Sequence, residues 1–291
     1  MALIKSISGI RGTIGGKPDT ALTPIDIVKY SAAFGSWVLE KTKNNKIIIG
    51  RDARMSGEMV NNLVVSTLQA LGMQVIDLGL STTPTVEMAV KMEHAGGGII
   101  ITASHNPREW NALKLLNHEG EFISGTDGEQ VLEKGNNADF VFAEITKLGS
   151  IEKNDTYMQK HIDAILNHSF VDKQLIEKKN FKIVVDGINS TGATFVPFLL
   201  EALGVKQIEV INAEVNGKFN HNPEPLPENL NEIANTVVKH KADLGIVVDP
   251  DVDRLCFVCE DGSMFGEEYS LVAIADYILS NQKGNTVSNM S

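Results

Sequence analysis

The run Lys46-Ile47-Ile48-Ile49 is followed by a Gly-rich turn, by a helical pattern of apolar residues from Val60 to Leu71, and by the run Gln74-Val75-Ile76-Asp77-Leu78. Short β-branched runs are typical of buried strands, and apolar residues three and four positions apart are typical of a helix. A strand, a helix and a second strand in this order predict two parallel strands joined by a crossover helix.

The same pattern continues on both sides of this unit. Thr23 and Pro24 suit the cap and the first position of an earlier helix. Thr83-Pro84 opens a later helix, which leads to the run Gly98-Ile99-Ile100-Ile101. We therefore expect an α/β fold, in which a mixed, mostly parallel sheet is covered by helices on both faces to give a three-layer module.

A second copy of this module follows in residues 182–211. A strand, a Gly-rich turn, a helix and another strand recur there in the same order, and Leu200-Glu201-Ala202-Leu203-Gly204 resembles Leu68-Gln69-Ala70-Leu71-Gly72. The sequence thus predicts repeated α/β modules.

The polar stretch 149–155 lies between the repeats and is the expected domain boundary. We expect a first domain over residues 1–150, a second over 151–262, and the start of an incomplete third over 263–291. In this third part, Glu267 to Leu279 has a helical pattern, and Thr286-Val287-Ser288 is expected to open a strand.

Bulk composition narrows the class of protein. The chain has 291 residues, 43% of them hydrophobic, which is enough for about two domains with well-filled cores. The net charge of −11 argues against nucleic acid as a partner, because the phosphate backbone would be repelled. The sequence contains no apolar stretch near the ~20 residues of a transmembrane helix, and its start lacks a signal-peptide pattern. A cytoplasmic protein that does not bind membranes is the simplest interpretation.

Two loops carry the chemistry. Ser104 lies in the turn Thr102-Ala103-Ser104-His105-Asn106-Pro107, directly after an apolar run, where a rigid strand can aim a nucleophile. Asp249, Asp251 and Asp253 follow the apolar run 244–248 and place three carboxylates on one loop, which suits a hard divalent cation. Together the two loops indicate metal-assisted phosphoryl transfer through a phosphoserine.

Each feature has a simpler alternative. The serine turn has the composition of an ordinary surface turn, and the acidic loop has the carboxylate spacing of an EF-hand, with Glu260 at its twelfth position. Arg254 occupies the sixth position, where an EF-hand needs Gly, and the flanking segments have strand patterns. Cys256-Phe257-Val258-Cys259 matches a metal-binding spacing, but it is more typical of a buried strand, on which the two thiols point to opposite faces.

Several motifs in one order resemble the α-D-phosphohexomutase family, which includes phosphoglucomutases, phosphomannomutases and phosphoglucosamine mutases. They are Ile10-Arg11-Gly12, residues 50–57, the Ser104 turn and the acidic loop. The resemblance implies a four-domain architecture, of which this chain would contain the first two domains and the start of the third. It also implies an isomerase that interconverts hexose 1-phosphate and hexose 6-phosphate through a bisphosphate intermediate, with a hexose 1,6-bisphosphate as activator.

The resemblance assigns roles to eight residues. Ser104 would be the phosphorylated nucleophile, and Asp249, Asp251, Asp253 and the phosphoserine oxygen would bind Mg²⁺. Lys114 and Arg11 would line the site, with Lys114 as the acid/base because a lysine crowded by cations shifts its pKa. His105 and Arg254 would contact the phosphoserine. For Arg51 and Arg54 a bracing role and a phosphate-binding role remain equally open, and the Pro-rich segment 221–230 is assigned to structure.

The sequence departs from the family pattern at two places. Pro250 occupies the position of the glycine in the family's usual Asp-Gly-Asp. The segment Trp110-Asn111-Ala112-Leu113-Lys114 stands where many relatives have Asn-Gly before the lysine. These features resemble the archaeal-type phosphoglucosamine or phosphomannose branch, although glucose phosphate remains open as a substrate. A chain without the later domains is expected to turn over poorly on its own. The alternatives are a phosphoserine-dependent sugar phosphatase and a non-catalytic fragment that binds sugar phosphate. The sequence gives no indication of oligomeric state.

Overall fold

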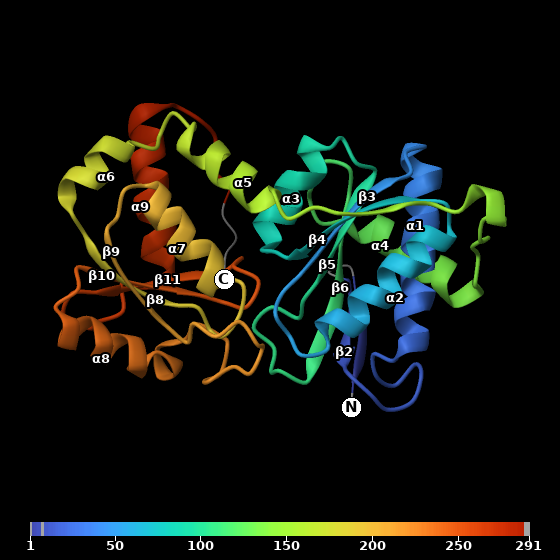
Figure 1. Cartoon of the computed structure of the whole chain (residues 1–291), viewed down its shortest axis with the longest axis horizontal. Coiled ribbons are helices and arrows are strands. Elements are labelled where there is room, and N and C mark those ends of the chain that lie inside the picture. The colour runs from blue at the N-terminus through green and yellow to red at the C-terminus, as the bar shows by residue number, and fades with distance from the viewer. Residues whose placement is uncertain (1, 7–8, 288–291) are drawn as a thin grey trace.

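The computed structural model describes residues 2–6 and 9–287 and has two lobes, each built on one β-sheet (Figure 1). The first sheet has the order β1-β2-β6-β5-β3-β4-β7 and the second has the order β11-β10-β8-β9. The strands are β1 (Leu3–Ser6), β2 (Gly9–Thr13), β3 (Lys46–Arg51), β4 (Gln74–Leu80), β5 (Gly97–Ile101), β6 (Trp110–Leu116), β7 (Ile151–Lys153), β8 (Lys182–Asp186), β9 (Gln207–Ile211), β10 (Leu244–Val248) and β11 (Leu255–Cys259).

Helices cover both faces of each sheet. Those of the first lobe are α1 (Pro24–Thr42), α2 (Gly57–Ala70), α3 (Thr83–Met92) and α4 (Gly125–Asn137). After the linker between the lobes come α5 (Tyr157–Leu166), α6 (Lys173–Lys179), α7 (Gly192–Ala202), α8 (Asn231–His240) and α9 (Glu267–Asn281). Short 3-10 turns lie at Ile145–Lys147 and Pro227–Asn229. The expected α/β fold of repeated three-layer modules with mixed sheets is therefore confirmed.

The first helix shows how closely local sequence sets these elements. Thr23 accepts a hydrogen bond from the Asp26 backbone N–H, the Asp26 carboxylate accepts one in return from the Thr23 backbone N–H, and Pro24 lies in the first turn. This reciprocal capping satisfies two of the N–H groups that a helix start leaves unpaired. The helix then buries Ile27, Tyr30 and Phe34 in the larger of the two cores of the first lobe.

Two cores flank each sheet. In the first lobe, side chains of α1 and α2 pack on one face and Val86 and Val90 of α3 pack on the other. In the second lobe, Ile233 and Val237 of α8 cover one face, while α7 covers the opposite face. Helix α3 contacts α5, and α5 contacts α7, so these three helices join the lobes (Figure 1).

Strand pairing brings distant residues to one place. β3 and β5 are parallel, β5 and β6 are antiparallel, and β2 pairs with β6. Ile100 pairs with Lys114, and Arg11 pairs with Ala112. Ser104 follows the carboxyl end of β5, where open α/β sheets place their ligands. The acidic loop follows β10 in the same way and connects it to antiparallel β11.

The structure extends the first sheet beyond residue 150. β7 (Ile151–Lys153) pairs with β4, although it was expected to belong to the second domain. We therefore propose that the boundary falls in the linker 154–156. The strand expected at Thr286-Val287-Ser288 is wrong for its first two residues, which are irregular, and Ser288 lies outside the described residues. A strand needs a neighbour to satisfy its backbone groups, and no described strand pairs with residues 286–287.

The segment containing the two thiols forms β11, with Cys256 buried in the core of the second lobe. Strands, rather than helices, flank the acidic loop, so the EF-hand interpretation is excluded. Within residues 2–6 and 9–287, no helix is both long and apolar enough to span a bilayer.

Candidate active site

Arg54 shapes the loop that carries Ser104. Its guanidinium is fully buried, and it donates to the carbonyl oxygens of Ser104 (2.5 Å), Asn106 (2.7 Å), Pro107 (2.7 Å) and Trp110 (3.0 Å), and to Asp52 Oδ2 (3.0 Å). A guanidinium has five N–H donors, and these five bonds use all of them. Arg54 therefore has no donor left for a phosphate, which decides between the two roles left open for it: it braces the loop.

Asp52 holds the two residues, Arg54 and Thr102, that hydrogen-bond to the Ser104 loop. It is buried and accepts hydrogen bonds from Arg54 and from Thr102 Oγ1, while Thr102 Oγ1 accepts from the backbone N–H of Ser104. Ser104 itself has a φ of +49°, in the left-handed region that L residues seldom adopt. Such strain persists only when the surroundings over-determine it, as they do here.

Arg51 differs from Arg54. It is partly exposed and donates to the backbone carbonyl of Asp52 (3.1 Å). It does not line the Ser104 cavity.

The acidic loop lies directly against Ser104. The Ser104 hydroxyl donates to Asp249 Oδ2 at 2.5 Å and is 3.5 Å from Asp253 Oδ1. Asp249 Oδ1 accepts from the backbone N–H groups of Asp253 and Arg254, both at 3.1 Å, which folds the loop around the carboxylate. The Pro250 carbonyl accepts from Ser190 (2.7 Å) and Thr191 (2.9 Å), so proline at this position is compatible with a well-held loop.

The three carboxylates fit a divalent cation. One oxygen from each of Asp249, Asp251 and Asp253 lies within 4.8 Å of the others. Asp251 Oδ1 is buried and accepts no hydrogen bond from any residue in the described ranges, which leaves it available as a ligand. Burial, followed by the charges of Asp251 and Asp253, raises the pKa of Asp249 to about 9. Such a cluster is relieved by a bound cation with oxygen preference, such as Mg²⁺.

Lys114 reaches into the same cluster. Its Nζ donates to Asp251 Oδ2 and Asp253 Oδ2, both at 2.7 Å, and its side chain is largely buried. Burial opposes the charged form, but the charges of Asp251 and Asp253 outweigh it and raise the pKa of Lys114. The expectation that cations crowd this lysine is therefore wrong: its neighbours are carboxylates, and they keep it protonated. Lys114 thus acts as a hydrogen-bond donor to both carboxylates.

A cavity of about 370 Å³ opens over Ser104. It is lined by Arg11, Ser104, His105, Lys114, Phe122, Ile123, Asp253 and Arg254. Every residue that the family resemblance placed at the site therefore either faces this cavity or belongs to the acidic loop. Arg11 donates to Asn106 Oδ1 at 3.0 Å, which ties β2 to the serine loop.

His105 lies beside Ser104 in the cavity wall. Its Nδ1 lies 3.4 Å from Ser104 Oγ. Burial, and then the positive charge of Arg254, lowers the pKa of His105, so the imidazole is uncharged at neutral pH.

Two supporting residues were missed in the sequence. Thr83, the first residue of α3, donates its hydroxyl to Asp251 Oδ2 at 2.5 Å and its backbone N–H to the Asp251 carbonyl at 2.8 Å. Glu224 accepts from Arg254 Nη1 at 3.0 Å. The sequence pattern marks Thr83 only as the start of a helix, and Glu224 only as part of a structural Pro-rich loop. Each bond joins segments far apart in the sequence, so no local pattern identifies either residue.

Comparison with known proteins agrees with this arrangement. Residues 3–141 match the family model for "Phosphoglucomutase/phosphomannomutase, alpha/beta/alpha domain I", and residues 159–262 match the corresponding model for domain II. The chain belongs to the phosphoglucomutase/phosphomannomutase family. The two matched domains correspond to the two lobes and contain the Ser104 loop and the acidic loop respectively.

Curated relatives in this family are longer. A phosphoglucomutase/phosphomannomutase of Thermococcus kodakarensis is 35% identical over 94% of this chain and 60% of that protein. A phosphoglucosamine/phosphogalactosamine mutase of Sulfurisphaera tokodaii is 34% identical over 90% of this chain and 56% of that protein. The chain thus spans about three fifths of the length of the curated relatives it matches. These relatives are named as phosphohexomutases, which are isomerases.

Solved structures in the phosphoglucomutase/phosphomannomutase family show the same fold. A putative phosphomannomutase from Thermus thermophilus superimposes with a TM-score of 0.83 at 23% identity, covering 97% of this chain and 62% of that one. A family protein from Burkholderia thailandensis gives a TM-score of 0.80 at 26% identity, covering 96% and 59% of the two chains.

Proposed function

We propose that this chain carries the phosphoryl-transfer centre of a hexose phosphate mutase, with Ser104 as the covalent phosphoryl carrier. The observation that carries the proposal is the contact between Ser104 Oγ and Asp249 Oδ2, which joins a nucleophile from one lobe to a cation-binding loop from the other. A serine hydroxyl beside three carboxylates suits a serine whose oxygen shares a divalent cation with those carboxylates.

The transfer divides into two half-reactions. In the first, the Oγ–P bond of phosphorylated Ser104 breaks while a hydroxyl oxygen of a hexose monophosphate bonds to the same phosphorus, and the proton of that hydroxyl ends on the serine oxygen, giving a hexose bisphosphate. In the second, the other sugar O–P bond breaks as Ser104 Oγ bonds to that phosphorus, and the serine proton ends on the released sugar oxygen of the isomeric monophosphate, which leaves. Mg²⁺ held by Asp249, Asp251, Asp253 and the serine oxygen would supply charge stabilisation for the group in transit. A hexose 1,6-bisphosphate would load the serine initially.

The cations around the cavity bind and orient the substrate. Arg11 and Arg254 face the cavity from opposite lobes, so each offers a fixed positive fork to a phosphate. Lys114, kept protonated by its carboxylate neighbours, would serve as the acid for the serine oxygen when it is the leaving group, and would recover its proton from the attacking hexose hydroxyl. His105, neutral and 3.4 Å from Oγ, would accept the serine proton when Oγ is the nucleophile and return it to the released sugar oxygen.

Glucosamine, mannose and glucose phosphates are the proposed substrates, in a cytoplasmic setting. The names of the relatives support this range, since they include glucosamine- and mannose-directed mutases. Because the chain spans about three fifths of these relatives, we propose that it loads Ser104 but turns over slowly by itself.

The reaction class is tested by ³¹P NMR of the chain with Mg²⁺ and glucose 1,6-bisphosphate. Transfer to Ser104 releases one glucose monophosphate per chain without inorganic phosphate, because the acceptor is a protein hydroxyl and not water. Sustained release of inorganic phosphate would instead identify a phosphatase, and the absence of both products would leave a sugar-phosphate-binding chain without transfer activity.

A further inference from the structure

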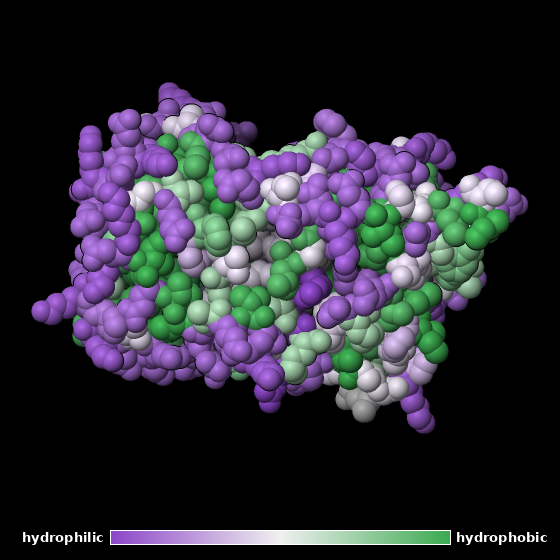
Figure 2. All heavy atoms as spheres, in the orientation of Figure 1, coloured by the Kyte–Doolittle hydropathy of each residue, from purple (hydrophilic) through white to green (hydrophobic). Residues whose placement is uncertain are grey.

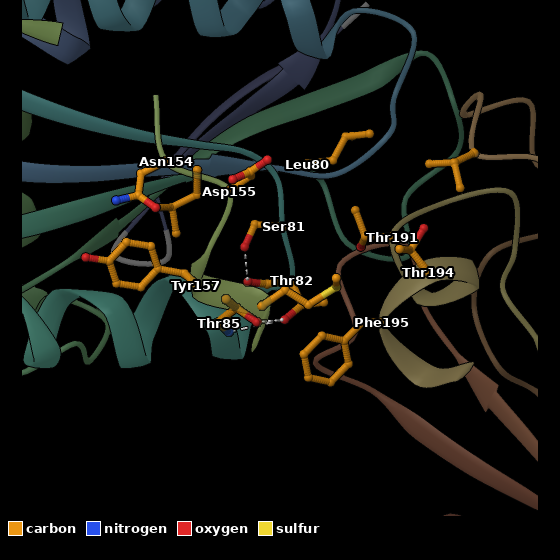
Figure 3. A pocket seen from close by; sticks show the side chains of 13 residues that line it. Leu80, Ser81, Thr82, Thr85, Asn154, Asp155, Tyr157, Thr191, Thr194 and Phe195 are labelled. Atoms are coloured by element: carbon orange, nitrogen blue, oxygen red, sulfur yellow. Dashed lines mark hydrogen bonds between the residues drawn. The ribbon is translucent and has the colours of Figure 1, made fainter. Parts of the chain in front are cut away.

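A groove lies at the junction of the two lobes, and none of its lining residues faces the Ser104 cavity. One part, here called the apolar half, encloses about 260 Å³ and is lined by apolar groups from both lobes, including Leu78, Leu80, Tyr157, Met158, Phe195 and Val215. Figure 3 shows Thr82 and Thr85 of the α3 start between Tyr157 and Phe195. Apolar side chains reach the surface at this junction in the space-filling view (Figure 2).

A second part, the polar half, continues from the first. It encloses about 470 Å³ and shares Leu78, Asn154 and Asp155 with the apolar half. Its lining carries charges of both signs: Arg51 and Lys153 are positive, and Glu58, Asp77 and Asp155 are negative. The two halves lie beyond the carboxyl ends of β4 and β7, the edge of an α/β sheet at which ligands commonly bind.

Asn61 gives independent evidence for a ligand in the polar half. Its side chain lines this half, is only 8% exposed, and donates through Nδ2 to Asp77 Oδ2 at 2.9 Å. That bond fixes the orientation of the amide. Its oxygen Oδ1 is buried and accepts no hydrogen bond from any residue that the structure describes. A buried acceptor without a donor is costly, so the position calls for an N–H or O–H group from outside the chain.

We propose that this groove, here called the interlobe groove, binds a free amino acid with an apolar side chain. The ammonium group supplies the donor that Asn61 Oδ1 lacks and lies near Glu58 and Asp155, while the carboxylate pairs with Arg51 or Lys153. The side chain fills the apolar half, against Tyr157 and Phe195. A zwitterion matches a lining of mixed charge, whereas a simple anion would meet repulsion from the three carboxylates and a simple cation repulsion from the two basic side chains.

The interlobe groove is also coupled to the acidic loop. Thr191, which lines the apolar half, donates to the Pro250 carbonyl, and Thr82 lies next to Thr83, which donates twice to Asp251. A ligand wedged between these two helix starts changes the position of the carboxylates, and so changes their affinity for Mg²⁺. By linkage, Mg²⁺ then changes the affinity for the ligand by the same factor.

The test measures binding of L-phenylalanine to the whole chain by ¹⁵N–¹H NMR titration, with phenethylamine, which lacks the carboxylate, as the matched probe. We expect saturable binding of L-phenylalanine with shifts at Leu78, Asn154 and Thr194, and binding of phenethylamine at least about tenfold weaker. Leu80→Trp fills the mouth of the groove at a position that is 48% exposed, so the variant is expected to fold and to lose binding. Leu175→Trp, at a similarly exposed position on α6, is the control that keeps it.

Asn61→Leu provides a second variant that removes the acceptor while keeping the size of the side chain. It too is expected to lose binding. The proposal is overturned if L-phenylalanine shows no saturable binding, if phenethylamine binds equally well, or if binding survives both Leu80→Trp and Asn61→Leu. Because binding is measured without a phosphoryl donor, its outcome is separate from that of the proposed mutase reaction.

Discussion

Ser104 Oγ and Asp249 Oδ2 lie 2.5 Å apart, although 145 positions separate the two residues in the chain. The serine follows a strand of the first sheet, and the aspartate follows a strand of the second. The contact therefore exists only when both lobes are folded and docked. This makes the proposed centre sensitive to any change that displaces one loop relative to the other.

Removal of one carboxylate tests the cation site. Asp251→Asn is expected to weaken Mg²⁺ binding by about 100-fold or more, because it replaces a buried charged oxygen by a neutral one. Isothermal titration calorimetry measures the affinity, and Asp261→Asn, in an exposed turn outside the cluster, is the control. Unchanged Mg²⁺ binding in Asp251→Asn would rule out these carboxylates as the ligands.

The bracing role of Arg54 predicts a large loss of stability. Arg54→Met leaves Asp52 buried without its partner and removes four donors to the serine loop, so unfolding should become easier by about 3–5 kcal/mol. Arg51→Met, the matched change on a partly exposed arginine, should cost about 1 kcal/mol or less. Urea denaturation measures both. Equal losses in the two variants would contradict the assignment of Arg54 as the brace.

Glu224 is expected to act through Arg254. The pair is about one-third exposed, so its contribution is modest, and Glu224→Gln should slow phosphorylation of Ser104 by up to about fivefold. Arg254→Gln removes the group that faces the cavity and should slow it by about 100-fold. Glu228→Gln, on the same loop, is the control. The account fails here if Glu224→Gln slows the reaction as much as Arg254→Gln does.

His221 predicts a pH dependence of stability. Burial opposes its charged form, but the hydrogen bond and charge of Asp186, 2.9 Å from Nε2, outweigh burial and raise the pKa of His221 above 6.5. The folded state thus holds a proton that the unfolded chain releases near pH 6.5. The contribution of the His221–Asp186 pair to the free energy of unfolding is therefore complete below pH 6.5 and is lost as the pH rises through the pKa of His221 in the folded state. Urea midpoints at several pH values should show this fall in the parent chain and a shallower one in His221→Gln.

The sequence was a good guide wherever one segment determines the outcome. The strand 46–49, the capped helix after Thr23 and the two loops that bear carboxylates and serine have local patterns, and the structure forms each of them. The family resemblance added Arg11 and Lys114 to these loops. Both lie at the cavity because β2 and β6 pair beside β5.

The neighbours of individual side chains could not be predicted from the sequence. The donors of Arg54 are satisfied by carbonyls about 50 positions away, and the neighbours of Lys114 come from the other lobe. A pattern of residue types does not reveal whether a lysine meets cations or carboxylates, and so the sign of its pKa shift was reversed. The strand expected at residues 286–287 was wrong for a similar reason, since a strand depends on a partner that local sequence does not specify.

Peptide mass mapping after incubation with glucose 1,6-bisphosphate and Mg²⁺ tests the central claim most directly. The account predicts one phosphoryl group on the peptide that contains Ser104, lost in Ser104→Ala and kept in Ser263→Ala, which alters an exposed turn of the second lobe. A phosphoryl group on another residue, or an equal label in Ser104→Ala, would contradict the assignment of Ser104 as the phosphoryl carrier.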